Sequence, residues 1–298
     1  MTPDITIVVP AYNRRDYLGL ALRSALDQTF QNLEVIVVDD GSTDNSMEVV
    51  EQIQKTDPRV RIFVHQKNRG PSAAINTGIL NAKSRYITFL GSDDLFAPER
   101  CQVLCSSLDA EQEPCVVYSD LIDVDTAQTR IIPRLSTASY RPEGMVFAHI
   151  LAGSFHFEGG PIALPKSCFD EVGLFDETLR WCIDIDMALR LSAKFPFRFE
   201  RLSTYGYRSH QGNSRIVMDK VQRMKYESRI LERHLLDNLG TLDSNTRRKA
   251  FNRLFGCYIG SGQWRKLIRT SFVDWQALIS MLTIPKRMNR LNPTVTRS

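Results

Sequence analysis

The chain has 298 residues, of which 43% are hydrophobic and 24% are charged, and its formal net charge is +4. This length is enough for one large α/β domain or two ordinary domains, each with a substantial core. The composition is that of a globular protein and argues against disordered and fibrous classes.

Short apolar runs alternate with helical patterns through the first third of the chain. The runs predict strands at Ile5–Val9, Glu34–Val38, Val60–Val64 and Tyr86–Leu90. Helical spacing between them predicts helices through Tyr17–Leu26, Met47–Ile53 and Pro71–Ala82. Nearly uniform apolar strands that alternate with helices indicate an α/β fold with a mainly parallel central sheet flanked by helices.

The pattern is less regular after the first third. Short strands are predicted at Val116–Tyr118, Pro161–Leu164 and Phe197–Glu200, and helices near Phe147–Leu151 and Asp184–Lys194. From about Val217 onward the pattern is helical. We therefore predict one domain over residues 1–215, divided near residue 95, and a basic, amphipathic helical extension over residues 216–298.

Polar groups follow three of the predicted strands directly, at Pro10–Asn13, Asp39–Asp40 and Ser92–Asp94. Sites on parallel sheets lie beyond the carboxyl ends of the strands, so these groups are expected to converge. Adjacent carboxylates repel unless a cation offsets them, and oxygen ligands suit Mg²⁺ or Mn²⁺. In isolation, however, each Asp pair could equally be a solvated turn or a helix cap.

Several segments, taken together and in this order, closely resemble the family-2 glycosyltransferases over about Ile5 to Ser214. They are ITIVVPAYN, EVIVVDDGSTDNS, NRGPS, YITFLGSDD, GLFDE and the stretch from Asp184 to Arg190. The resemblance implies a GT-A fold and an inverting glycosyltransferase that uses a nucleotide-sugar donor. It also implies that residues 1–95 bind the nucleotide and residues 96–215 the acceptor.

The resemblance assigns roles at the donor side. Donor-binding residues would be Pro10, Ala11, Tyr12, Asn13, Asp39, Asp40, Gly70, Asn76, Asp93 and Arg208. Asp40 would read the base, usually uracil, with Asp39 near the ribose and Asp93 at the sugar or ribose. Asp94 would bind the divalent metal, Mn²⁺ or Mg²⁺, with His210 as a second ligand and Arg208 at the phosphates. A structural role for His210 in the polar loop Tyr207–Ser214 is the alternative.

Direct displacement at an anomeric carbon requires a base that takes the proton from the acceptor hydroxyl. Asp184 falls on the family's catalytic aspartate, and Ile183 stands where the family often has an acid. Asp186 is the alternative base, and Asp184 could instead cap a helix whose surface carries Asp186. Acceptor contacts are expected from the aromatic and Gly-rich segment containing Glu158 and Gly159, and from Trp181; an ordinary loop is the alternative there.

The charge of the chain is unevenly distributed. The segment from Asn245 to the end carries +10, so residues 1–244 carry −6. An apolar stripe that includes Trp264, Leu267 and Ile268 fits either a helix on an anionic membrane surface or one docked on the protein. A membrane would favour a lipid-linked or glycan acceptor.

The six cysteines include no CxxC pair and are expected to be buried in a reducing compartment. The first residues lack a signal peptide pattern, and no uncharged apolar run reaches about 18 residues. We therefore expect a cytoplasmic protein, peripheral on the inner face of the membrane if the basic tail binds lipid.

Two other classes compete with the glycosyltransferase interpretation. A nucleotidyltransferase or kinase on a related sheet would need a Gly-rich triphosphate loop, and GxxxxGK[ST] is absent from the sequence. A nucleic-acid-binding protein could use the basic tail, but no recognised binding motif supports it, so no nucleic-acid partner is expected.

Overall fold

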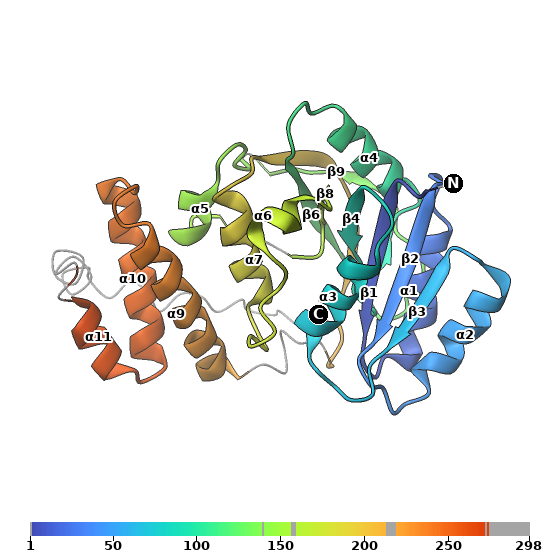
Figure 1. The fold of residues 1–298 in the computed structure, drawn as a ribbon, viewed down its shortest axis with the longest axis horizontal. Helices are drawn as coiled ribbons and strands as arrows, with labels where there is room; N and C mark the ends of the chain where they lie inside the picture. The colour runs from blue at the N-terminus through green and yellow to red at the C-terminus, as the bar shows by residue number, and fades with distance from the viewer. Residues whose placement is uncertain (1, 139, 156–158, 213–218, 272, 274–298) are drawn as a thin grey trace, which may run out of the picture. The chain divides into compact units, whose positions relative to one another are not determined.

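The computed structural model describes residues 2–138, 140–155, 159–212, 219–271 and 273. The chain forms two compact units. The first contains the residues up to Ile150 and Ser154–Asp219, and the second contains Leu151–Gly153 and the described residues from Lys220 onward. Figure 1 shows the sheet of the first unit and the helices of the second.

One twisted sheet organises the first unit, and within the described residues its strand order is β3-β2-β1-β4-β8-β6-β9-β5, with β7 beside β9. The strands are β1 (Ile5–Ala11), β2 (Leu33–Asp39), β3 (Val60–Val64), β4 (Tyr86–Phe89), β5 (Leu95–Phe96), β6 (Val116–Val124), β7 (Arg134–Leu135), β8 (Ile162–Pro165) and β9 (Phe197–Arg208). The helices of this part of the chain are α1 (Arg15–Leu26), α2 (Ser46–Thr56), α3 (Pro71–Asn81), α4 (Arg100–Asp109), α5 (Phe147–Leu151), α6 (Cys168–Val172) and α7 (Ile183–Ser192).

The four strands β3, β2, β1 and β4 are parallel, as the apolar runs predict. In this register Ala11 pairs with Asp39, and Val8 pairs with Phe89. The carboxyl ends of β1, β2 and β4 therefore meet at one edge, and the polar segments that follow them start there.

The alternation of side chains along β1 explains why helices cover both faces of this half-sheet. Ile7 and Val9 are fully buried in a cluster with Leu18 and Leu22 of α1. Val8 points to the opposite face, where α3 lies so close that a Cβ on Gly78 would come within 2.4 Å of the Val8 side chain. A strand buried on both faces carries mainly apolar residues, which is why it appears in the sequence as a nearly continuous apolar run.

The second half of the sheet is mixed. Strand β8 is antiparallel to β4 and β6, whereas β6 and β9 are parallel. Strand β9 is much longer than the predicted Phe197–Glu200 segment, because it continues to Arg208. The predicted polar loop at Tyr207–Ser214 is therefore wrong at its start: Tyr207 and Arg208 belong to the strand and pair with Asp123 and Val124 of β6.

The second unit is helical, with α9 (Lys220–Asp237), α10 (Ser244–Gly260) and α11 (Trp264–Ser271). The side chain of Asp243 caps α10 by accepting hydrogen bonds from the backbone N–H groups of Asn245 and Thr246. Buried aromatic side chains on α10 include Phe251 and Phe255. Among the described residues, no helix combines the length and the apolar character that crossing a membrane requires.

Candidate active site

The loops that follow β1 and β2 are joined by hydrogen bonds at the carboxyl edge. Asn13 has a left-handed backbone with φ of 51°, and its N–H donates to Ser42 Oγ at 2.9 Å. Its side-chain oxygen accepts from the N–H of Thr43 at 2.8 Å. Of the neighbouring predicted donor residues, Pro10 and Ala11 end β1, and Tyr12 is 44% exposed. An exposed aromatic ring on a fixed loop can stack against a nucleotide base.

Asp39 and Asp40 are both buried and both hold backbone in place. Asp39 accepts from the N–H of Ser42 at 3.2 Å and from the Ser42 hydroxyl, which closes the turn after β2. Asp40 accepts from the N–H groups of Arg69 at 2.9 Å and Gly70 at 2.7 Å. Asp40 thus fixes the loop that starts α3, although its Oδ2 keeps capacity for one more donor.

His65 is a neighbour of Asp40 that the sequence did not reveal. Its Nδ1 lies 2.7 Å from Asp40 Oδ1, and its Nε2 lies 2.9 Å from Thr77 Oγ1 on α3. Both ring nitrogens are therefore engaged, and the imidazole orients the Asp40 carboxylate from behind.

The start of α3 is tied to the segment that leads to α7. The Asn76 side chain donates to Phe175 O at 2.9 Å and accepts from the Phe175 N–H at 2.9 Å. Arg69 pairs with Glu177 at 3.0 Å. Asn76 is 4% exposed, so here it joins two segments of the site.

Asp94 lies at the base of the site and is 6% exposed. Its Oδ2 accepts from the Tyr205 hydroxyl at 2.6 Å, and its Oδ1 accepts from the N–H of Arg208 at 2.9 Å. Burial, together with the negative charge of Asp93, raises the pKa of Asp94 to about 7. Burial also raises the pKa of Tyr205 far above its ordinary value, so Tyr205 stays protonated and donates.

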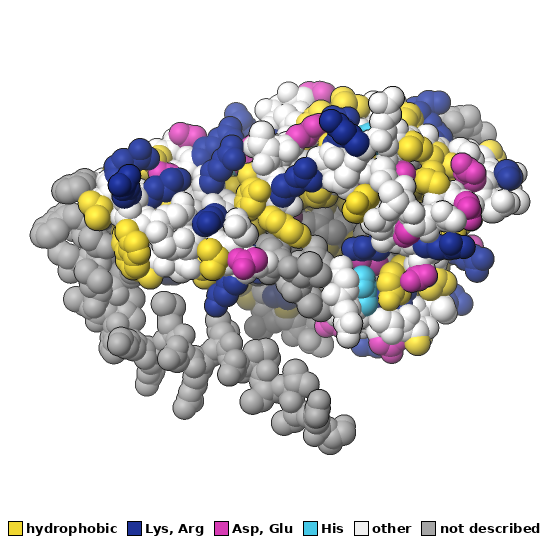
Figure 2. All heavy atoms as spheres, turned by 90° about the horizontal axis from the view of Figure 1, so that it is seen from below, with side chains coloured by type: hydrophobic (Ala, Val, Ile, Leu, Met, Phe, Trp, Pro, Cys, Tyr) yellow, Lys and Arg dark blue, Asp and Glu magenta, His cyan; other side chains and the backbone are white. Residues whose placement is uncertain are grey.

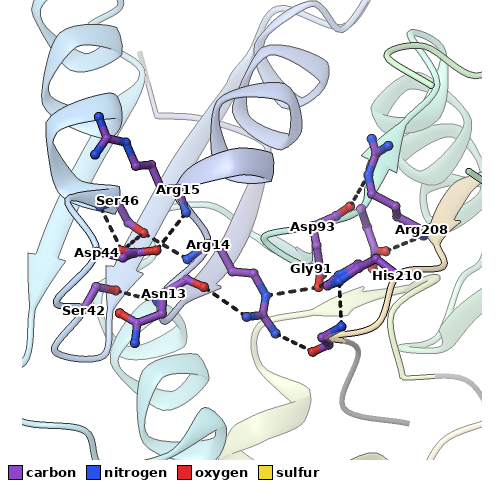
Figure 3. A network of polar contacts seen from close by, with 12 residues as sticks. Asn13, Arg14, Arg15, Ser42, Asp44, Ser46, Gly91, Asp93, Arg208 and His210 are labelled. Atoms are coloured by element: carbon purple, nitrogen blue, oxygen red, sulfur yellow. Dashed lines mark hydrogen bonds and ion pairs between the residues drawn. The ribbon is translucent and has the colours of Figure 1, made fainter. Parts of the chain in front are cut away.

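Asp93 points to the other side, where three segments meet (Figure 3). Its Oδ2 lies 2.9 Å from His210 Nε2 and 3.2 Å from Arg14 Nε. Arg14 also donates to Gly212 O at 3.2 Å, and the Tyr17 ring packs on His210 with centroids 4.7 Å apart. The structure thus brings Asp93 and His210 together, and it adds Arg14, which the sequence analysis missed.

Arg208 is fully buried beneath this group. Its Nε donates to the backbone O of Asp93 at 2.8 Å, and its Nη1 donates to the carbonyls of Asp125 and Thr126 at 2.7 and 3.0 Å. These contacts favour a role in holding the Asp93 backbone, in place of the phosphate contact that the sequence predicts.

Asp184 is in the first turn of α7, after Cys182, whose backbone is left-handed with φ of 58°. A Cβ added to Gly159 would lie 2.6 Å from Asp184 Cβ, and one added to Gly160 would lie 2.8 Å from Tyr205 Oη. Since Tyr205 binds Asp94, the two glycines connect the predicted base to the Asp93–Asp94 pair. Trp181 is partly buried just before α7, and Glu158 lies outside the described residues.

Comparison with known proteins identifies the family. Residues 6–166, more than half of the chain, match the sequence model of Glycosyl transferase family 2. The chain belongs to glycosyl transferase family 2. The resemblance noted in the sequence is thereby confirmed, and the protein is a glycosyltransferase.

A relative of similar length is the succinoglycan biosynthesis protein ExoO of Rhizobium meliloti. It is 30% identical over 310 residues, which cover 97% of this chain and 87% of that protein. The alignments with five other bacterial relatives cover only 31–40% of the length of those proteins.

Two solved structures confirm the GT-A fold of this family 2 glycosyltransferase. Staphylococcus aureus TarS with UDP-GlcNAc superposes with a TM-score of 0.67, at 17% identity over 85% of this chain and 73% of that one. The mannosyltransferase PcManGT of Pyrobaculum calidifontis, with GDP-Man and Mn²⁺, gives 0.59 at 16% identity over 96% and 82%.

The donor set at Asp93 fits a divalent cation that the protein would share with a substrate. A carboxylate oxygen and an imidazole nitrogen converge at 2.9 Å, and both types of atom bind Mn²⁺. No group of three or more His, Cys, Asp or Glu side chains suited to a metal occurs in the part of the chain that the structure describes. Two protein ligands are enough for Mn²⁺ or Mg²⁺ when phosphate oxygens and water complete the shell.

Replacement of Gly159 by Ala in this glycosyltransferase is expected to lower turnover by about 100-fold, because displacement of a reacting group by about 1 Å can cost that much. The new Cβ would lie 2.6 Å from Asp184 Cβ, so Asp184 would have to shift. Steady-state turnover is measured beside thermal unfolding, with Gly240→Ala as the control, because a Cβ at Gly240 would meet nothing within 4 Å. Full turnover in Gly159→Ala would contradict the close approach of the two residues.

Asp186, the alternative base, is buried and forms an ion pair within α7. It is 2% exposed and forms an ion pair with Arg190 at 2.8 Å, so the prediction that it lies on the helix surface is wrong. Breaking a buried ion pair typically costs about 3–5 kcal/mol. Asp186→Asn is therefore expected to lower the free energy of unfolding by a comparable amount, measurable by urea denaturation. If the variant kept its stability but lost turnover, the result would instead support Asp186 as the catalytic base.

Proposed function

We propose that the chain transfers a sugar, with inversion, from a nucleotide-sugar donor to a hydroxyl group of a glycan or lipid-linked acceptor. Asp184 is the base, and a divalent metal assists departure of the nucleoside diphosphate. Family membership and the name of ExoO support glycan biosynthesis, and the nucleotide sugars bound to TarS and PcManGT support the donor class.

The observation that carries the proposal is the link between Asp184 and the Asp93–Asp94 pair. Gly159 and Gly160 are consecutive, and one abuts Asp184 while the other abuts Tyr205, the hydrogen-bond partner of Asp94. With Asp184 on the acceptor side and the Asp93–Asp94 pair on the phosphate side, the anomeric carbon of the donor would lie between them. Single displacement needs this arrangement, and it inverts the carbon.

At the acceptor side, Asp184 takes the proton of the attacking hydroxyl. Gly159 allows Asp184 to lie beside it, and Trp181 would offer an aromatic face to a sugar ring. Glu158 is retained as an acceptor residue because it belongs to the aromatic and Gly-rich segment that the sequence analysis singled out.

At the donor side, a bound divalent metal would neutralise the charge that grows on the diphosphate. Asp93 and His210 would hold it. We favour Asp93 over Asp94 as the direct ligand because Asp94 is only 6% exposed and is held by hydrogen bonds from β9, whereas Asp93 lies 2.9 Å from His210. Asp94 would then position Tyr205 and the end of β9.

At the base-binding end, Tyr12 would pack on the nucleobase, and Asp40 Oδ2 would accept a ring N–H with its remaining capacity. Uracil presents such an N–H group, so a UDP-sugar is the favoured donor. Asp39 and Asn13 would then border the ribose.

A donor screen tests this function. Purified chain, Mn²⁺ and single nucleotide sugars are combined with acceptor mixtures, and released nucleoside diphosphate is measured together with the product anomer by NMR. Release of UDP and an inverted anomer are expected. Release of pyrophosphate would identify a nucleotidyltransferase instead, and a retained anomer would exclude a single displacement with Asp184 as the base.

A further inference from the structure

We propose that α11 of the second unit is a docking surface for a membrane containing anionic lipids. The surface consists of Trp264 and Ile268 with the flanking Arg265. Among the described residues of this helix, the buried one is the polar Thr270, whereas the apolar side chains of Trp264 and Ile268 are exposed.

The inward side of α11 makes polar contacts with α9. Lys266 Nζ lies 3.0 Å from one carboxylate oxygen of Glu232, and the tip of Arg269, whose side chain is 76% exposed, lies 3.0 Å from the other. Thr270, 3% exposed, is the buried residue of this helix among those described. These contacts fix the rotation of α11 about its axis.

The outward side is apolar. Trp264 is 56% exposed and Ile268 is 60% exposed, and residues four apart lie on the same face of a helix. In the neighbouring helix α10, by contrast, the apolar residues Phe251, Leu254 and Phe255 are fully buried, as is usual for a core helix. The exposed pair is therefore left outside a core that the same unit has already formed. The predicted members of this stripe at Phe272 and beyond Val273 lie outside the described residues.

The positive net charge of the second unit favours an anionic partner. Residues 220–273 contain twelve Lys or Arg and four Asp or Glu, a net charge of +8. Figure 2 shows Lys and Arg side chains in dark blue over the helical unit on the face in view, and over the first unit as well. Lysine and arginine near an anionic lipid surface attract it, and Trp at the headgroup level adds apolar contact.

The same charge argues against the other occupants of the surface. A second copy of the unit would also carry +8 and would be repelled. The last 25 residues of the chain carry +3, so they offer no opposite charge either. Nucleic acid would match the charge, but its phosphates offer no apolar contact to the exposed Ile268 side chain.

Flotation of the full chain with vesicles tests the proposal. Binding is expected to vesicles that mix phosphatidylglycerol with phosphatidylcholine, and not to vesicles of phosphatidylcholine alone. Trp264→Ala with Ile268→Ala should weaken binding at least tenfold, because buried apolar area drives interfacial association. Arg265→Gln should weaken it about fivefold, the effect expected for one charge near the lipid surface.

Matched controls come from the first unit. Val64 and Leu80 are 60% and 65% exposed, so Val64→Ala with Leu80→Ala removes exposed apolar surface from the first unit. Lys55→Gln removes an exposed charge on α2. Neither control should change vesicle binding. All variants alter exposed side chains, so their thermal unfolding should match that of the parent.

Three results would overturn the proposal. The first is absence of flotation with the anionic vesicles near physiological salt. The second is equal flotation of the Trp264→Ala, Ile268→Ala variant and its control. The third is conversion of a dimer to a monomer by that variant, seen by light scattering, which would assign the surface to a second copy.

Discussion

Asp184→Asn is expected to lower the turnover of sugar transfer by about 1,000-fold, within the range that general base catalysis contributes. The amide has the shape of the carboxylate but cannot take the acceptor proton. Asp184 is partly exposed at the start of α7 and is not part of the core, so folding should be preserved. Turnover is measured as released nucleoside diphosphate, and donor affinity by calorimetry should change less than about twofold.

Asp170→Asn is a suitable control for this prediction. Asp170 is an exposed carboxylate in the first turn of a helix of the same unit, α6, and it should tolerate the change in both turnover and stability. Full turnover in Asp184→Asn would remove the proposed base. Loss of donor binding in the same variant would move Asp184 from the acceptor side to the donor side.

The first half of the fold was predictable because its information is local. Strands β1, β2 and β4 are buried on both faces, so each appears in the sequence as an apolar run with a defined end. The segments after these ends must lie at one edge of a parallel sheet. The sequence alone therefore assigns Asp39, Asp40 and Asp93 to that edge.

The second half was harder because its strands are mixed and its helices are short. Helix α4 was not predicted, although Cys101, Leu104, Cys105 and Leu108 follow helical spacing and are all buried. Counting cysteine as an apolar residue in that window would have revealed it. The length of β9 depends on its pairing with β6, and its own alternation of polar and apolar residues does not indicate it.

The detailed site could not be predicted because its contacts join distant segments. Arg14 and Asp93 are 79 residues apart, and Tyr205 and Asp94 are 111 apart. A local pattern identifies which carboxylates follow strands, but it does not say which of two adjacent carboxylates turns inward. The strand β9 decides this here by donating both the Tyr205 hydroxyl and the Arg208 N–H to Asp94.

Asp93→Asn is expected to weaken Mn²⁺ binding by about 100-fold, at least the loss seen when groups one shell further out are removed. The variant removes the negative charge that faces His210 and leaves the shape of the side chain. His210→Gln should have a smaller effect, since it removes one neutral ligand. The measurement is Mn²⁺ affinity by electron paramagnetic resonance in the presence of UDP, and it does not depend on transfer activity.

Substitution of Arg14 is expected to change Mn²⁺ affinity in the opposite direction. Its guanidinium lies 3.2 Å from the same Asp93 oxygen, so a cation that binds there must compete with it. Arg14→Gln should therefore tighten Mn²⁺ binding, whereas Arg15→Gln, at the first residue of α1, should leave it unchanged. If Asp94→Asn abolished Mn²⁺ binding while Asp93→Asn and Arg14→Gln had no effect, the metal would belong to Asp94. The hydrogen bonds from Tyr205 and Arg208 would then have to yield to it, and β9 would shift when the donor binds.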